Sequence, residues 1–342
     1  MELGPHELAH IFANLPDLAD GILIRSVCRL WRDLVDPPRI DGLTIPDILR
    51  LTPNRMLETA CRAKVINLAK YAISRGATNF NDGLVCACES GQNVEKRKQK
   101  EIVELMVAHG ATDFDSGLCI ACYNGDEEIV DLMISHGATD FDHALGDACR
   151  GGHKELASFI ISCGVTTLKF GLFGACYSGN EVLVVYTIAL GATDFNGGLD
   201  IACCRGHIML AELMIAHGAT ELNSGLFGAC YNGHKKIAEL LVSRGANDFD
   251  RGLHGACHGG RKEIAGLMIR HGATDLNSGL HGACYGGHKE IAELMISRGA
   301  TKFDWGLHGA CHGGHKELAE LIGSLAPTIV CAHCRKLGAE HV

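Results

Sequence analysis

An Ala-Cys pair recurs along most of this chain at a fixed interval. Successive cysteines of the pair are 27 residues apart, except that Cys88 and Cys122 are 34 apart. The cysteines are Cys61, Cys88, Cys122, Cys149, Cys176, Cys203, Cys230, Cys257, Cys284 and Cys311. A period of this length is typical of stacked repeat proteins, because one unit cannot bury its apolar face alone and must pack against its neighbours. The period therefore predicts a solenoid of ten units over residues 55–326.

The first half of each unit predicts a short helix. In one well-formed unit we expect it over residues 278–285, with the small Cys284 allowing close approach of a neighbouring helix. Asn277, and Asp304 in the next unit, come two residues before a Gly-Leu pair. We interpret both as N-caps, because a short side-chain oxygen can accept the orphan N–H groups of the first turn.

The second half of each unit predicts an amphipathic helix. In the same unit it covers residues 288–298, and Ile291, Leu294 and Met295 fall at helical spacing as its buried stripe. Gly299 is the expected left-handed stop. Two helices and a short connection per unit predict an all-α, helix-pair solenoid.

The residue pattern of the unit resembles an ankyrin repeat. Residues 278–288 read Ser-Gly-Leu-His-Gly-Ala-Cys-Tyr-Gly-Gly-His, against the family pattern Thr-Pro-Leu-His-x-Ala-Ala-x-x-Gly-His, and Gly-Ala follows at 299–300. The unit is six residues shorter than the usual 33. The resemblance implies loss of most of the projecting β-hairpin, which leaves tight loops and little or no strand. Such shortened units are similar to those of large DNA viruses of protists.

Residues 1–40 do not follow the repeat. They carry Pro-x-Glu-Leu at 5–8, Ile-Phe-x-x-Leu-Pro at 11–16 and Val-Cys-Arg-x-Trp-x-x-Leu at 27–34. This order resembles an F-box, a three-helix module that binds the Skp adaptor of cullin-based ubiquitin ligases. The resemblance implies adaptor contact by Pro5, Leu8, Ile11, Phe12, Leu15, Pro16 and Trp31. The alternative interpretation is a cap on the first repeat, which a terminal repeat needs.

The residue after each repeated Cys varies between units. In the ankyrin repeats that the units resemble, this place lies on the inner face and is free to vary. We predict a partner-facing row there, made of Tyr123, Tyr177, Tyr231, His258, Tyr285 and His312. Four residues earlier stand Cys119, Phe173, Phe227, His254, His281 and His308. We interpret this earlier row as mainly structural, because the family histidine at that place bonds nearby backbone.

Composition excludes several classes of function. The net charge of −9 argues against a general nucleic-acid surface. The sequence has no run of 18 apolar residues, so no membrane span is predicted. Equivalent helices stack about 8–10 Å apart, too far for bridges between the repeated cysteines. We therefore expect free thiols among the seventeen cysteines and a reducing intracellular setting, cytoplasmic or nuclear. We expect a monomer.

Metal and catalytic sites find little support. The pairs His254/His258 and His308/His312 lack a third ligand, and the tail at 327–342 holds only Cys331, Cys334 and nearby histidines. No nucleophile motif, phosphate loop or acid pair is recognisable. We therefore expect no metal, no cofactor and no enzymatic activity, although a metal-dependent module in the tail remains a third hypothesis.

The hypothesis that we favour is an adaptor. Residues 1–40 would bind a Skp-type adaptor, residues 41–54 would be a linker, and the repeats would hold an unknown target protein for ubiquitin transfer. The alternative is a plain scaffold or decoy that binds a host protein and has no link to a ubiquitin ligase.

Overall fold

The computed structural model describes residues 39–40, 43–44, 50–89 and 96–325. The chain forms two compact parts, each with several repeats. We call them unit 1 (Met1–Thr166) and unit 2 (Thr167–Val342). Apart from Arg39 and Ile40, the expected F-box-like segment lies outside the described residues, and so does the C-terminal tail.

The first described elements of unit 1 are two short antiparallel strands, in which Arg39 is opposite Thr44. Helix pairs follow them. The elements are β1 (Arg39–Ile40), β2 (Leu43–Thr44), α5 (Pro53–Arg62), α6 (Ile66–Ser74), α7 (Phe80–Cys88), α8 (Lys96–Ala108), α9 (Phe114–Asn124), α10 (Glu127–Ser135), α11 (Phe141–Gly151) and α12 (Lys154–Ser162). Helix α5 thus starts at Pro53, inside the range expected to be linker, because proline is favoured in a first helical turn.

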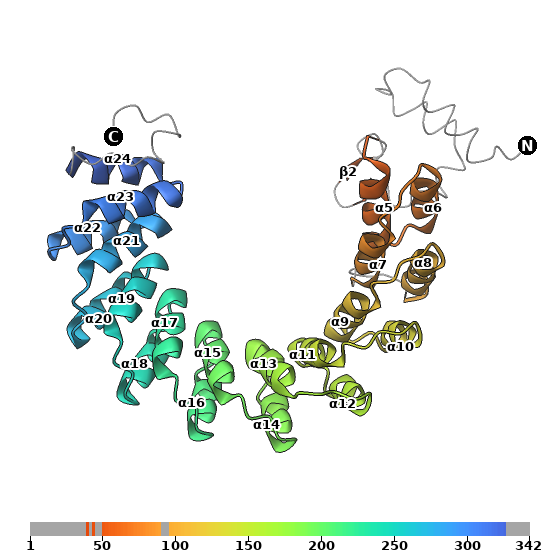
Figure 1. Ribbon diagram of the computed structural model, residues 1–342, viewed down its shortest axis with the longest axis horizontal. Coiled ribbons are helices and arrows are strands. Elements are labelled where there is room, and N and C mark those ends of the chain that lie inside the picture. The colour runs from red at the N-terminus through yellow and green to blue at the C-terminus, as the bar shows by residue number, and fades with distance from the viewer. Residues whose placement is uncertain (1–38, 41–42, 45–49, 90–95, 326–342) are drawn as a thin grey trace, which may run out of the picture. The chain divides into compact units, whose positions relative to one another are not determined.

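In unit 2 the described residues, 167–325, form six helix pairs. They are α13 (Lys169–Ser178), α14 (Glu181–Ala189), α15 (Phe195–Arg205), α16 (Ile208–Ala216), α17 (Leu222–Asn232), α18 (Lys235–Ser243), α19 (Phe249–His258), α20 (Lys262–His271), α21 (Leu276–Gly286), α22 (Lys289–Ser297), α23 (Phe303–His312) and α24 (Lys316–Leu325). Within each unit the odd-numbered helices stack in one layer and the even-numbered helices in another (Figure 1). From 50–89 and 96–325 the described chain holds helices and loops only, which confirms the predicted all-α solenoid.

The core runs between the two layers. In α21, Leu280, Ala283 and Cys284 are fully buried, and in α22 Met295 is buried as expected. Leu294, which we predicted in the buried stripe, is only half-buried. Ala292 lies on the buried face instead. Helix α19 of the preceding repeat packs closely against α21, as the small residues Ala283 and Cys284 predict.

The helix starts differ from the prediction. Asp275 caps α21, and its Oδ1 accepts the Ser278 N–H at 3.0 Å, so the helix begins at Leu276. Asn277 is therefore already inside the first turn, and its Oδ1 instead accepts the backbone N–H groups of Thr301 and Lys302, both at 2.8 Å. The prediction of Asn277 as the cap was wrong.

This contact recurs between neighbouring repeats, and we call it the inter-repeat clamp. The clamp residues are Asn54, Asn81, Asp115, Asp142, Asn196, Asn223, Asp250 and Asn277. Asp304 holds the same position in α23, after the N-cap Lys302, so its predicted capping role was also wrong. The clamp supplies partners for N–H groups in a connection too short to pair with itself.

Glycines end the helices as the sequence predicts. Gly287 closes α21 with φ +78°, and Gly299 follows α22 with φ +109°. Lys64 is the exception in the first repeat, because it takes the same left-handed conformation, with φ +58°, where later repeats have glycine. Among the described residues it alone does so without being glycine.

The insertion in the second repeat lengthens a helix. Helix α8 has 13 residues, whereas the equivalent α10 has 9. Its basic residues are exposed, and Arg97 lies 4.0 Å from Glu101. The rest of the insertion falls in 90–95, outside the described residues.

The cysteines are mostly free and buried. Thirteen described cysteines are free thiols, and burial raises the pKa of Cys61, Cys149 and Cys257 to about 12. Cys311 is disulfide-bonded, and its partner is none of those thirteen. The expectation of free thiols throughout therefore fails at Cys311. No helix of the described chain is both long and apolar enough to cross a membrane.

Candidate partner-binding surface

The predicted partner-facing residues all lie near the C-terminal ends of odd-numbered helices. Tyr123 is on α9 in unit 1, and the others are on α13, α17, α19, α21 and α23 in unit 2. Tyr123, Tyr231 and Tyr285 are 48%, 37% and 43% exposed. Large aromatic side chains exposed to this extent are available to a partner.

In unit 2, Tyr231, His258 and Tyr285 contact one another across successive helices. The His258 ring lies 5.0 Å from the rings of both Tyr231 and Tyr285, edge to face with each. This is a favoured arrangement of aromatic rings. We call Tyr231, His258, Tyr285 and His312 the alternating row.

The position four residues earlier forms a second row. The rings of His254 and His281 are 6.1 Å apart and stacked, and the same distance separates His281 from His308. We call these three the histidine row, and both rows together the ladder. His254 Nδ1 lies 3.0 Å from the carbonyl oxygen of Ser278, which agrees with a structural role for this residue.

The ladder is held in place from the second helices. The Nε2 atom of His288, the N-cap of α22, lies 3.1 Å from the carbonyl oxygen of His258. The His288 ring covers Gly260, where a Cβ atom would lie 2.6 Å from it. In the same way, the Nε2 atom of His315 lies 3.2 Å from the carbonyl oxygen of Tyr285. A histidine of one repeat therefore fixes the backbone of the alternating-row residue in the preceding repeat, as His288 does for His258 and His315 does for Tyr285.

Burial and neighbouring imidazoles act on the charge of the ladder. Burial lowers the pKa of His258, and the imidazoles of His254 and His288 lower it further. Burial also lowers the pKa of His281, with added repulsion from four other ladder histidines. Both rings are therefore predominantly neutral at neutral pH.

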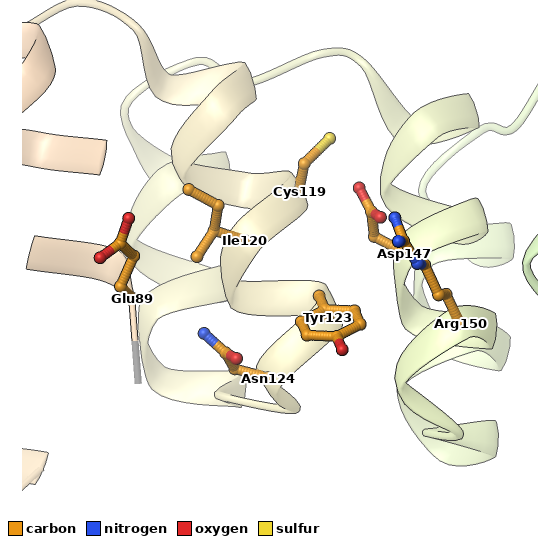
Figure 2. A pocket seen from close by; sticks show the side chains of 7 residues that line it. All are labelled: Glu89, Cys119, Ile120, Tyr123, Asn124, Asp147 and Arg150. Atoms are coloured by element: carbon orange, nitrogen blue, oxygen red, sulfur yellow. The ribbon is translucent and has the colours of Figure 1, made fainter. Parts of the chain in front are cut away.

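Unit 1 carries a pocket of about 460 Å³ on the corresponding side of α9 and α11. Its lining residues are Glu89, Cys119, Ile120, Tyr123, Asn124, Asp147 and Arg150. Figure 2 shows Asp147 and Arg150 projecting from one helix toward the helix that carries Cys119 and Tyr123. The guanidinium carbon of Arg150 is 5.7 Å from the centre of the Tyr123 ring, a cation–π distance.

The pocket is suited to binding rather than to covalent chemistry. Burial raises the pKa of the Asp147 carboxyl, although the Cys119 thiol and Arg150 act in the other direction. Burial and the Asp147 charge raise the pKa of the Cys119 thiol, which donates a hydrogen bond to that carboxyl. A protonated thiol is a poor nucleophile. The pocket therefore offers a polar hollow to a partner side chain.

Asp147 is the pocket residue that the sequence prediction missed. Five other units have glycine at this place, which are Gly174, Gly228, Gly255, Gly282 and Gly309. At Gly282 a Cβ atom would lie 2.9 Å from the backbone oxygen of His254. Aligning the units by their cysteines would have singled out Asp147 as a charged residue at a position of close helix approach.

Within the described ranges no three His, Cys, Asp or Glu side chains are grouped so as to hold a metal ion. The rings of His308 and His312 are 4.3 Å apart. The cysteines and histidines of the tail lie outside the described residues.

Comparison with known proteins identifies the repeats. A family model of ankyrin repeats, three copies long, matches residues 226–304, which cover most of α17 through α22 and the start of α23. No curated protein matched the chain. Ankyrin repeats indicate a scaffold for protein–protein interaction, and an all-helical fold of this kind is typically a binding scaffold rather than an enzyme.

Proposed function

We propose that this chain is a substrate receptor of a cullin-based ubiquitin ligase. Residues 1–40 bind the Skp-type adaptor, and the repeats hold the target protein. Other subunits carry out ubiquitin transfer. The observation that carries the proposal is the joint presence of an F-box-like residue order and a repeat scaffold in one chain.

The order of apolar residues in 1–40 supports the adaptor contact. A cap on a terminal repeat needs one apolar face, whereas this segment has two sets of apolar residues, one ending at Pro16 and one containing Trp31. The second set leaves apolar side chains available for a partner, as in the F-box that the segment resembles.

The repeats supply the target-binding half. Tyrosine or histidine occupies the position after the repeated Cys on α13, α17, α19, α21 and α23 of unit 2, where Tyr231, Tyr285 and His312 are exposed, and a polar pocket is present in unit 1. Repeated weak contacts along a stack of units can add up to a stable complex with one protein. The second candidate function, a scaffold or decoy without a ligase, uses the same repeats and leaves residues 1–40 as a cap.

The test is co-purification of the full chain with a Skp adaptor. Leu8→Glu with Phe12→Glu is expected to abolish a stoichiometric complex, because both substitutions place charge in the expected apolar contact. The matched control is Val182→Glu with Met209→Glu, which adds the same charge at residues 62% and 60% exposed on α14 and α16. The control is expected to retain the adaptor.

Two outcomes contradict the proposal. If neither the unmodified chain nor the control binds the adaptor, residues 1–40 are a cap and the scaffold function stands. If the Leu8/Phe12 variant binds as well as the unmodified chain, any contact with the adaptor lies elsewhere.

A further inference from the structure

The ladder in unit 2 is a local exception in an acidic chain. The protein carries a net charge of −9, yet neither row of the ladder contains Asp or Glu. One turn nearer the helix starts stand Arg251, Ser278 and Trp305, and the Lys302 ammonium lies 4.1 Å from the centre of the Trp305 ring. Arg251 and Lys302 therefore place positive charge beside the ladder.

The nearest carboxylates are engaged by backbone groups of the connecting loops. Asp248 accepts the Arg251 N–H at 3.1 Å, and Asp275 accepts the Ser278 N–H at 3.0 Å. Asp250 accepts the N–H groups at 274 and 275 as an inter-repeat clamp. The clamp position of α23 holds Asp304. Asp248, Asp250 and Asp275 are thus held by backbone N–H groups at the helix starts, and the side chains of the ladder itself are all histidine or tyrosine.

The spacing of the histidine row fits an extended polypeptide. The rings of His254, His281 and His308 follow one another at 6.1 Å. In an extended strand, side chains on one face recur every second residue, about 6.6–6.8 Å apart. A segment that crosses α19, α21 and α23 in extended form therefore places every second side chain near one imidazole.

We propose that the ladder binds an extended acidic segment of a partner protein, with Asp or Glu at every second residue. The carboxylates lie along the histidine row, and the hydroxyls of Tyr231 and Tyr285 donate further hydrogen bonds from the alternating row. This inference rests on the target-binding role proposed above for the repeats, and it names the chemistry of the target. It is independent of residues 1–40.

Binding of such a segment takes up protons. The titratable and charged groups around the ladder come from every neighbouring helix. The cations, histidines and tyrosines are Tyr231, Arg251, His254, His258, His281, Tyr285, His288, Lys302, His308, His312 and His315, and the carboxylates at the helix starts are Asp248, Asp250, Asp275 and Asp304. A carboxylate beside an imidazole favours the imidazolium, so the bound state has higher histidine pKa values than the free state. Affinity therefore rises as the pH falls.

The test uses the full chain and two labelled peptides of equal composition. One peptide alternates Glu and Ser, and the other has the same residues in two blocks. Fluorescence anisotropy is expected to give about fivefold tighter binding of the alternating peptide at about pH 6 than at about pH 8, as one histidine pKa raised by one unit on binding produces over this range. The block peptide is expected to bind several-fold more weakly at both pH values.

Variants locate the site. His281→Gln with His308→Gln is expected to weaken the pH dependence, because two of the three imidazoles of the histidine row are lost. The matched control is His136→Gln with His217→Gln. These two histidines lie outside the ladder, and their rings stack on Phe114 and Phe195 at the starts of their own repeats. Calorimetry of the unmodified chain in buffers of different ionisation enthalpy is expected to show proton uptake, independent of any variant.

Three results overturn the inference. They are equal binding of the two peptides, pH-independent binding without proton uptake, and loss of binding when Lys96, Lys98 and Lys100 of α8 are changed to Gln. The Leu8/Phe12 variant separates this inference from the ligase proposal, because it is expected to bind the alternating peptide normally. Failure to bind a Skp adaptor therefore leaves the ladder proposal intact, and failure to bind the peptide leaves the ligase proposal intact.

Discussion

The side-chain oxygen of Asn277 lies 2.8 Å from the backbone nitrogen of Thr301 in the connection to the next unit. This clamp recurs along both units and joins repeats that have no hairpin between them. In α13 the clamp position is occupied by Lys169, whose ammonium group cannot accept a hydrogen bond. The Lys169 ammonium lies instead 5.2 Å and 5.8 Å from the rings of Phe170 and Phe173.

Lys169→Asn is therefore expected to stabilise unit 2. The new amide oxygen is placed to accept the N–H groups of Thr193 and Asp194, as Asn196 does for the next connection. A hydrogen bond of this kind contributes about 1 kcal/mol. Hydrogen exchange at Thr193 and Asp194 is expected to slow.

The control for this substitution is Lys289→Asn. Lys289 also begins a helix, α22, and is exposed, but it is not at a clamp position. Its free energy of unfolding is expected to change little. The clamp interpretation is rejected if Lys169→Asn is no more stable than this control.

Lys64 ends the first helix of the first repeat in an unusual way. Its Nζ atom donates hydrogen bonds to the carbonyl oxygens of Cys86, Ala87 and Glu89 at 2.9, 2.7 and 2.8 Å. These carbonyl groups are at the C-terminal end of α7, where they have no donor within the helix and need one from elsewhere. Burial lowers the pKa of Lys64, although nearby thiols and Glu89 act in the other direction.

Lys64→Met and Lys64→Gly are expected to differ. Methionine keeps the left-handed backbone strain and loses all three hydrogen bonds, at a cost of about 2–3 kcal/mol, as for hydrogen bonds from a charged group. Glycine loses the same bonds but relieves about 1 kcal/mol of strain. Hydrogen exchange in α7 is expected to be fastest in the methionine variant. The reverse order would show that the strain at Lys64 is unimportant.

The repeat period and its helices were predictable because their signals are local. Gly299 ends α22 where the sequence places it, and Cys284 is buried as its small size suggests. The role of Asn277 was not predictable from its own unit, because its hydrogen-bond partners come 24 and 25 residues later.

The candidate sites were predictable in part. The row after each Cys was identified from its variation, and in unit 2 three of its members, Tyr231, His258 and Tyr285, are in ring contact. Their role in binding stays a prediction. The regular 6.1 Å spacing of His281 from its neighbours, and the pocket around Asp147, depend on how successive helices stack, which no single unit encodes.

Gly260 provides a test of how His288 is seated. Gly260 and Gly314 have nearly equal φ angles of +75° and +77°. A Cβ atom at Gly260 would lie 2.6 Å from the His288 ring, whereas at Gly314 it would meet nothing within 4 Å. Gly260→Ala is expected to cost about 1–3 kcal/mol more than Gly314→Ala, because backbone strain is common to both and only the first displaces the ring.

Urea unfolding followed by circular dichroism measures this difference. An equal loss of stability in the two alanine variants would mean that the His288 ring moves aside without cost. A larger loss at Gly260 would establish that the ring, and with it the carbonyl of His258, is fixed by close packing.

Asp147 makes the stability of unit 1 depend on pH. Burial raises the pKa of its carboxyl above the ordinary value of 3.8, so the folded state binds the proton more tightly than the unfolded state does. Its favourable contribution is fully present below pH 3.8 and is lost as the pH rises through the folded pKa. Asp147→Asn removes this titration while keeping a similar shape.

The variant is therefore expected to gain stability relative to the unmodified chain as the pH rises, and to approach it below pH 3.8. Urea unfolding at several pH values measures the difference in free energy between the two proteins. A constant difference would contradict the raised pKa. A difference that falls as the pH rises would mean that Arg150 and the Cys119 thiol, which act against burial, outweigh it at this carboxyl.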